Sequence, residues 1–203
     1  MADRPILFSA PMVRALLAGT KTQTRRVFKA KNGGVWPNKN DLPGMRQILR
    51  NCPYGQPGDR LWVREAWMPD PPIDDTWAST AWNGCGRVIS EVPERFHHPR
   101  FCNYAADWLH GPITWRPSIH MPRWASRITL DVTGIRVERL QDISEADAIA
   151  EGVNVHSDHH GKPRTSIYSP VQAYRDLWES INGEGSWDAN PWVWVVEFPR
   201  VTP

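Results

Sequence analysis

The order of strand and helix patterns constrains the fold of this chain more than any other feature of its sequence. Strand patterns lie at residues 6–8, 22–27, 60–67, 127–140 and 192–201, with weaker signals at 87–92 and 101–105. Helix patterns occupy only residues 10–18, 144–151 and 169–181. A parallel sheet needs a regular alternation of strands and helices, which this order lacks. The sequence therefore predicts an α+β, mainly β, fold: a small, partly closed mixed β-barrel decorated by short helices.

Local signals set the ends of several elements. Ser144 and Asp147 match a capping box, and Gly152 ends that helix. Gly134 predicts a bulge or bend within residues 127–140. Ser169 and Pro170 open the last helix, whose expected apolar stripe is formed by Val171, Tyr174, Trp178 and Ile181.

The length of the chain, 203 residues, suits one substantial domain. Residues 29–57 are rich in glycine, asparagine and proline and are predicted to form a long loop. Residues 68–116 are mostly irregular, and residues 154–168 are polar. We therefore expect a single domain, 1–203, with insertions near these three segments.

Charge and cysteine content narrow the classes of function. The formal net charge of +2 does not indicate a highly charged nucleic-acid coat. The three cysteines contain no C-x-x-C pair, which favours a reducing, cytoplasmic location. A run of 18 apolar residues is absent, so we expect no membrane span. The cysteines lack the spacing of a zinc site, and the sequence contains no glycine-rich phosphate loop. We therefore expect neither a metal nor a cofactor.

Residues 19–26, GTKTQTRR, place reactive side chains directly after a glycine break. A Lys21 enclosed by barrel residues would lose solvation, and the lower pKa would make it a base near neutrality. A neighbouring Thr24 hydroxyl can then attack an amide carbonyl, while the Arg26 fork binds a carbonyl or phosphate oxygen. The residues alone also allow a structural interpretation, in which Lys21 and Arg26 form ion pairs with Glu151 and Glu65.

Four segments of the chain carry a resemblance to a known family. Gly19, Lys21, Thr24 and Arg26 match a G-x-K-x-x-T-x-R motif, and GDRLWVRE (58–65), SEADAIAEGV (144–153) and WVWVVEF (192–198) follow in order. In these segments the chain resembles ASCH domains of the PUA-like superfamily. Residues 117–130, PSIHMPRWASRITL, are similar to those of larger ASCH proteins found in phage and prophage genomes. The resemblance implies a PUA-like barrel.

The resemblance also implies functions. PUA-like domains mostly bind RNA or modified bases, and a small bacterial ASCH subgroup hydrolyses the amide of N4-acetylcytidine. In that subgroup a lysine and a threonine of the first motif and the glutamate ending the later helix are catalytic, which correspond here to Lys21, Thr24 and Glu151. We expect an amidohydrolase for an acylated pyrimidine nucleoside or base. A reader of RNA or of a modified base, without chemistry, and a metal-independent ribonuclease remain alternatives.

Further residues are candidates for substrate binding. Glu65 shares a strand face with apolar residues, where it either pairs with Arg26 or Arg64 or binds the amino edge of a base. Arg123, Trp124 and Ser126 offer an aromatic ring beside arginine, as stacking on an unpaired base requires, unless this segment is a structural turn. Tyr104 is assigned to the same cleft.

Overall fold

The structure, a computed structural model, describes residues 2–29, 37–38, 40–70, 92–109, 114–156 and 169–201. Contacts among these residues divide the chain into two compact units. The first unit comprises the described residues of Met1–Arg4, Ala15–Leu61 and Leu130–Pro203, and the second comprises those of Pro5–Arg14 and Trp62–Thr129. The single domain expected over residues 1–203 stays a prediction.

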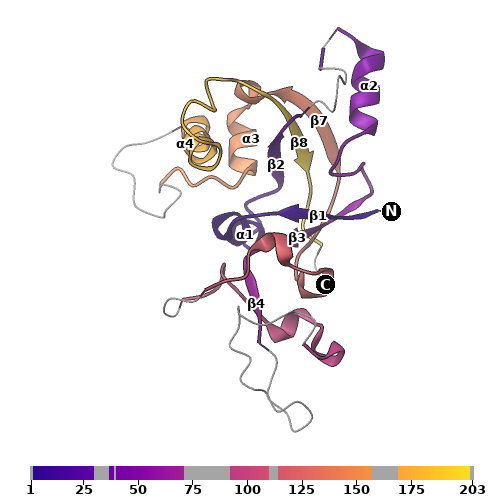
Figure 1. The fold of residues 1–203 in the computed structure, drawn as a ribbon. Helices are drawn as coiled ribbons and strands as arrows, with labels where there is room; N and C mark the ends of the chain where they lie inside the picture. Colours follow the sequence, from indigo (N-terminus) through magenta and orange to yellow (C-terminus); the bar gives the residue numbers. More distant parts are fainter. Residues whose placement is uncertain are drawn as a thin grey trace. The chain divides into compact units, whose positions relative to one another are not determined.

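A three-stranded antiparallel sheet forms the centre of the first unit (Figure 1). Its middle strand is β8 (Trp192–Glu197), which pairs with β2 (Gln23–Val27) on one side and β7 (Gly134–Arg139) on the other. The register places Arg25 and Arg136 opposite Val195, one from each neighbouring strand. Residues opposite one another in antiparallel strands share a face, so both arginines lie on the Val195 face.

The two faces of this sheet pack against different helices, as expected from the alternation of side chains along β8. Val193 and Val195 join a buried cluster with residues of α3 (Glu145–Ala150) and α4 (Pro170–Asn182). Trp194, on the other face, packs with Ile48 of α2 (Leu42–Arg50). Figure 1 shows α3 and α4 beside each other on one side of the sheet and α2 on the other.

The remaining elements form two smaller sheets and several short helices. One sheet has the order β1-β3-β6, formed by β1 (Asp3–Leu7), β3 (Arg60–Arg64) and β6 (Thr129–Asp131). The other pairs β4 (Trp67–Pro69) with β5 (Cys102–Tyr104). The helix α1 spans Ala10–Leu17. Single 3₁₀ turns are η3 (Glu94–Phe96), η4 (Pro99–Phe101), η5 (Ser118–His120), η6 (Arg123–Ala125) and η7 (Leu140–Asp142).

The α+β class is confirmed, but strands do not dominate it. Helix accounts for 33% and strand for 26% of the described residues. Within these residues the strands belong to three separate sheets, and no closed barrel is detected.

Several element boundaries differ from the sequence-based expectations. The predicted loop at 29–57 contains α2, which Asp41 caps by accepting a hydrogen bond from the Gly44 N–H. The strand expected at 60–67 is divided into β3 and β4, and the strand expected at 127–140 is divided into β6 and β7. The break before Gly134 agrees with the predicted bend. The weak strand at 101–105 is confirmed as β5, whereas the one at 87–92 lies almost wholly outside the described residues.

The predictions for the two helices beside the β2-β8-β7 sheet are largely confirmed. Ser144 caps α3, and Ser169 and Gln172 form a complete capping box for α4. Tyr174 and Trp178 are buried as expected, but Ile181 is 52% exposed, so its place in the apolar stripe was wrong. In the described part of the chain, no helix combines the length and apolar character that crossing a bilayer requires.

Candidate functional site

Lys21 lies where the end of α1 meets the end of α3. The Lys21 N–H donates to the Ala15 carbonyl, and residues 21 and 151 form an isolated β-bridge. Gly152 makes this approach possible, since its φ of 81° belongs to the left-handed region. A Cβ at Gly152 would lie 2.9 Å from the Ala15 Cβ and 3.0 Å from the Lys21 Cβ. A glycine is therefore required beside Lys21.

The Lys21 amine is buried and faces the carboxylate of Glu151. Lys21 Nζ donates to Glu151 Oε2 at 2.8 Å and to the Glu151 carbonyl at 2.9 Å. The Lys21 side chain has no solvent exposure, and that of Glu151 is 3% exposed. Burial lowers the pKa of Lys21 below its usual value, although the charge and hydrogen bond of Glu151 act in the opposite direction. A lysine and a carboxylate held in this way can act as a base and the group that orients it, and the same geometry also serves as a structural ion pair.

Arg25 also contacts Glu151, although sequence reasoning did not select it. Arg25 Nη1 donates to Glu151 Oε1 at 3.2 Å. On its other edge, Nε and Nη2 of Arg25 donate to Glu138 Oε1 at 3.1 and 2.6 Å. The Arg25 side chain is completely buried, and its guanidinium lies 5.9 Å from the ring centre of Tyr174 in α4.

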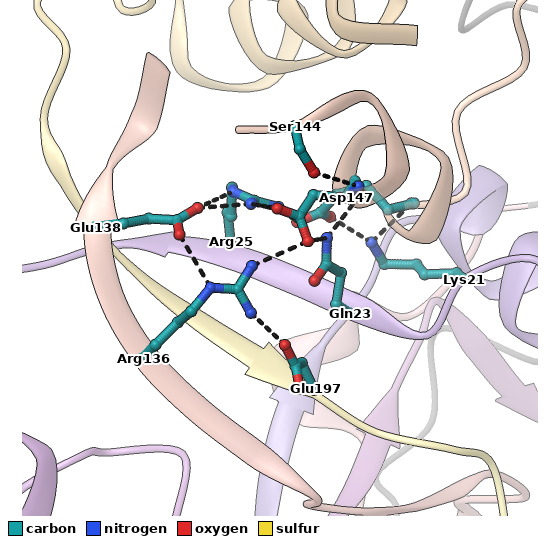
Figure 2. Close-up of polar contacts among 9 residues, drawn as sticks. Lys21, Gln23, Arg25, Arg136, Glu138, Ser144, Asp147 and Glu197 are labelled. Carbon is teal, nitrogen blue, oxygen red and sulfur yellow. Dashed lines mark hydrogen bonds and ion pairs between the residues drawn. The ribbon is translucent and has the colours of Figure 1, made fainter. Parts of the chain in front are cut away.

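These residues belong to a larger ion network on the α3 side of the sheet (Figure 2). It joins three cations to four carboxylates: Lys21, Arg25 and Arg136 with Glu138, Asp147, Glu151 and Glu197. Gln23 adds a hydrogen bond from its amide to Asp147 Oδ1 at 3.1 Å. The network connects β2, β7, β8 and the helix α3.

Thr24 and Arg26 lie on the opposite face of β2 from this network. Thr24 is opposite Val196 and Arg26 is opposite Trp194, whereas Arg25 is opposite Val195. Thr24 is 2% exposed, and none of the hydrogen bonds that the structure describes involves its hydroxyl. The positive charge of Arg26 nevertheless acts on Lys21. It lowers the pKa of Lys21, although burial is the larger cause of that change. Lys21 and Glu151 are thus brought together, and the Thr24 hydroxyl is not hydrogen-bonded to either.

The other predicted residues belong to the second unit, where Glu65 pairs with Arg127. Glu65 is 1% exposed, and its two oxygens accept hydrogen bonds from Arg127 Nε and Nη2 at 2.9 and 3.0 Å. The expected partner was Arg26 or Arg64, so that prediction was wrong. Burial raises the pKa of Glu65, while its bonds with Arg127 oppose this change. Arg127 also contacts Asp107.

The two aromatic candidates of the second unit, Tyr104 and Trp124, each pack against another side chain. The Arg127 guanidinium lies 3.9 Å from the ring centre of Tyr104, whose hydroxyl donates to the Ala125 carbonyl. Trp124 stacks on His97, with ring centres 4.5 Å apart.

Three more candidates make structural contacts within the second unit. Ser126 Oγ donates to the Val63 carbonyl at 2.8 Å. Arg64 donates to the carbonyls of Ile119 and Met121. The guanidinium groups of Arg64 and Arg123 lie 5.2 and 5.8 Å from the Trp62 ring centre.

One pocket that the structure describes lies beside α2 and does not include Lys21. It has a volume of about 530 Å³ and is lined by residues in and next to α2, namely Pro43, Arg46, Gln47, Arg50 and Asn51. Within the described ranges, no three His, Cys, Asp or Glu side chains are grouped as a metal site would require.

Comparisons with protein-family models, with curated proteins and with solved structures found no match to this chain.

Proposed function

We propose that this protein is an amidohydrolase that acts on an acylated pyrimidine nucleoside or base of the N4-acetylcytidine kind. Its catalytic residues are Lys21, Thr24 and Glu151, and its fold is a PUA-like barrel of the ASCH type. One observation carries the proposal: a completely buried lysine donates a 2.8 Å hydrogen bond to a buried glutamate. Charged groups are seldom buried in this way without a strong structural or catalytic reason.

The lowered pKa of Lys21 supports its role as a base. A neutral amine accepts a proton, and burial increases the neutral fraction near neutral pH. Glu151 orients the amine through Oε2 and stabilises the ammonium once the proton has been transferred. The same ammonium then supplies a proton to the leaving group.

The proposed reaction has two steps. In the first, the Thr24 oxygen bonds to the acyl carbon while its proton passes to Lys21. The C–N bond breaks, and the departing amino group of the pyrimidine takes that proton from Lys21. In the second, water hydrolyses the Thr24 ester and releases the carboxylic acid. Because Thr24 lies on the other face of β2 from the network of Lys21, the proposal requires residues 21–24 to rearrange when substrate binds, so that the Thr24 hydroxyl comes within hydrogen-bonding reach of Lys21 Nζ.

Turnover of N4-acetylcytidine, followed by chromatographic detection of cytidine, tests the proposal. We expect release of cytidine by the wild-type protein and its loss in Lys21→Met and Thr24→Val. Thr24→Ser retains a hydroxyl and should keep measurable activity, which separates a threonine nucleophile from a water activated directly by Lys21. Circular dichroism of each variant establishes that it is folded.

A matched control is the exposed pair Arg60–Asp131, whose side chains are 43% and 44% exposed. Arg60→Ala should leave turnover unchanged. If the wild-type protein releases no product from a panel of acylated cytidines and cytosines, the amidohydrolase proposal is wrong.

A second candidate function, binding of RNA or a modified base without chemistry, is favoured by the second unit. There the guanidinium groups of Arg64 and Arg123 both lie over the Trp62 ring. Arginine with an aromatic ring is the combination that holds unpaired bases. This function predicts RNA affinity that falls as salt increases and is lost in Arg123→Ala. RNA that is cut in the presence of EDTA would instead indicate the ribonuclease alternative.

A further inference from the structure

Arg25 occupies a position that the proposed mechanism does not use. Its side chain is completely buried on the α3 side of β2, and it points into the ion network as Figure 2 shows. Burying a guanidinium is costly unless its donors are matched by acceptors. Carboxylates of Glu138, Asp147 and Glu151 supply that match.

Glu151 is shared between two cations through different oxygens. Oε2 accepts from Lys21 at 2.8 Å, and Oε1 accepts from Arg25 at 3.2 Å. A carboxylate bound to a lysine alone can rotate and present either oxygen to it. The contact with Arg25 fixes the rotation of the Glu151 carboxylate and draws part of its negative charge away from Lys21.

Arg25 is itself fixed by a second anchor. Nε and Nη2 both donate to Glu138 Oε1, while Nη1 reaches Glu151. The planar guanidinium spans these two carboxylates, which the single ammonium of a lysine cannot do with the same geometry. Glu138 therefore holds Arg25 in place, and Arg25 holds Glu151.

We propose that Arg25 is a positioning residue that fixes Glu151 against Lys21 and sets how tightly Lys21 holds its proton. This inference rests on the proposed function, because the mechanism needs a lysine that exchanges its proton readily. Among the described residues, the charged groups that act on Lys21 include Glu151 from the end of α3 and Arg25 and Arg26 from β2. Tyr174 of α4 packs on Arg25. Both arginines disfavour the protonated amine, and Glu151 favours it.

Direct titration of Lys21 tests the inference without any substrate. The chain has five lysines, so ¹³C-labelled lysine gives few side-chain signals by NMR, and Lys21→Arg identifies the signal of Lys21. Arg25→Met should raise the pKa of Lys21 by about 1 unit, because a cation is removed and Glu151 becomes fully available. Arg25→Lys should restore only part of the wild-type titration, because it returns the positive charge but not the guanidinium that spans Glu138 and Glu151.

Arg136→Met is the matched control, because Arg136 contacts Glu138, Asp147 and Glu197 but has no described hydrogen bond with Glu151. It should leave the Lys21 titration unchanged. If Arg25→Met unfolds the chain, the double variant Arg25→Met with Glu138→Gln replaces it in the titration. The double variant removes one cation and one anion together, so it leaves the net charge of the network unchanged. The inference is overturned if the Lys21 titration does not move, or if Arg136→Met moves it equally.

Kinetics add a second readout and separate this inference from the proposed function. In an active enzyme, Arg25→Met should lower kcat with little change in KM and move the acidic limb of the pH profile, which the Lys21 base controls, to higher pH. An inactive wild-type protein would refute the proposed function, while the titration would still decide whether Arg25 controls Lys21. Equal losses in Arg25→Met and Arg25→Lys, with an unchanged pH profile, would show a purely structural role.

Discussion

Replacing Glu151 by glutamine is the most direct test of how the ion network stabilises the fold. The substitution keeps the shape of the side chain but removes the charge that faces both Lys21 and Arg25, at 2.8 and 3.2 Å. The amide oxygen can still accept from one cation, but the amide NH₂ then faces the other, donor against donor. Both cationic side chains have no solvent exposure, so water cannot replace the lost anion.

Breaking a buried ion pair by removing one partner costs about 3–5 kcal/mol. We expect Glu151→Gln to lower the free energy of unfolding by about this amount at pH 6. Urea denaturation followed by tryptophan fluorescence and by circular dichroism measures it. The exposed Arg60–Asp131 pair is the control, and Asp131→Asn should cost only about 0–1 kcal/mol.

The loss should also depend on pH, through Lys21. Because the folded-state pKa of Lys21 is lowered, the unfolded chain binds more protons between the folded and unfolded pKa values, and stability rises with pH there. Without Glu151 the pKa of Lys21 falls further, so in the variant this rise begins at a lower pH. The deficit of Glu151→Gln should therefore be smaller at pH 9 than at pH 6. A deficit no larger than that of Asp131→Asn, or one that grows towards pH 9, would refute the reasoning.

Three further predictions concern the same unit. Lys21→Met should cost less stability than Glu151→Gln in urea denaturation, because Glu151 keeps its contact with Arg25; an equal or larger cost would contradict the shared role of Glu151. Gly152→Ala should destabilise the protein more than Gly19→Ala, because both have positive φ but only a Cβ at position 152 meets Ala15 and Lys21; the thermal midpoints of the two variants decide this. Ser169→Ala removes the capping box of α4 and should cost about 1 kcal/mol by urea denaturation, whereas an unchanged midpoint would mean that the cap contributes nothing.

The elements predicted best are those whose signals are local. The caps at Ser144 and Ser169 lie next to the helices they begin, and glycines mark the breaks. The helix α2 was missed because Pro43 and Gly44 resemble loop residues, although proline is tolerated in a first helical turn and Asp41 caps the Gly44 N–H.

The candidate site shows the same division between local and long-range information. The approach of Lys21 to Glu151 was expected from a motif resemblance. The role of Arg25 in the network was not expected, because its partners come from β7 and α3, and only the register of the sheet brings them together. Side chains alternate between the two faces of a strand, so the sequence alone would have placed Gln23 and Arg25 on the face opposite Thr24. By the same rule, Arg136 and Glu138 share one face of their own predicted strand.

The central place of β8 has a consequence for how this protein is made. Within the described strands, β2 and β7 pair with β8 and not with each other, and β8 follows both of them in the chain. We therefore expect Arg25, which lies opposite Val195 of β8, to keep its contact with water in a nascent chain until β8 has also emerged. Long-range pairing of this kind is slow, because the loop must close before its contacts form. We therefore expect the full desolvation of Arg25 to require the pairing of β2 with β8, whose Val193 and Val195 add buried apolar area on the same face.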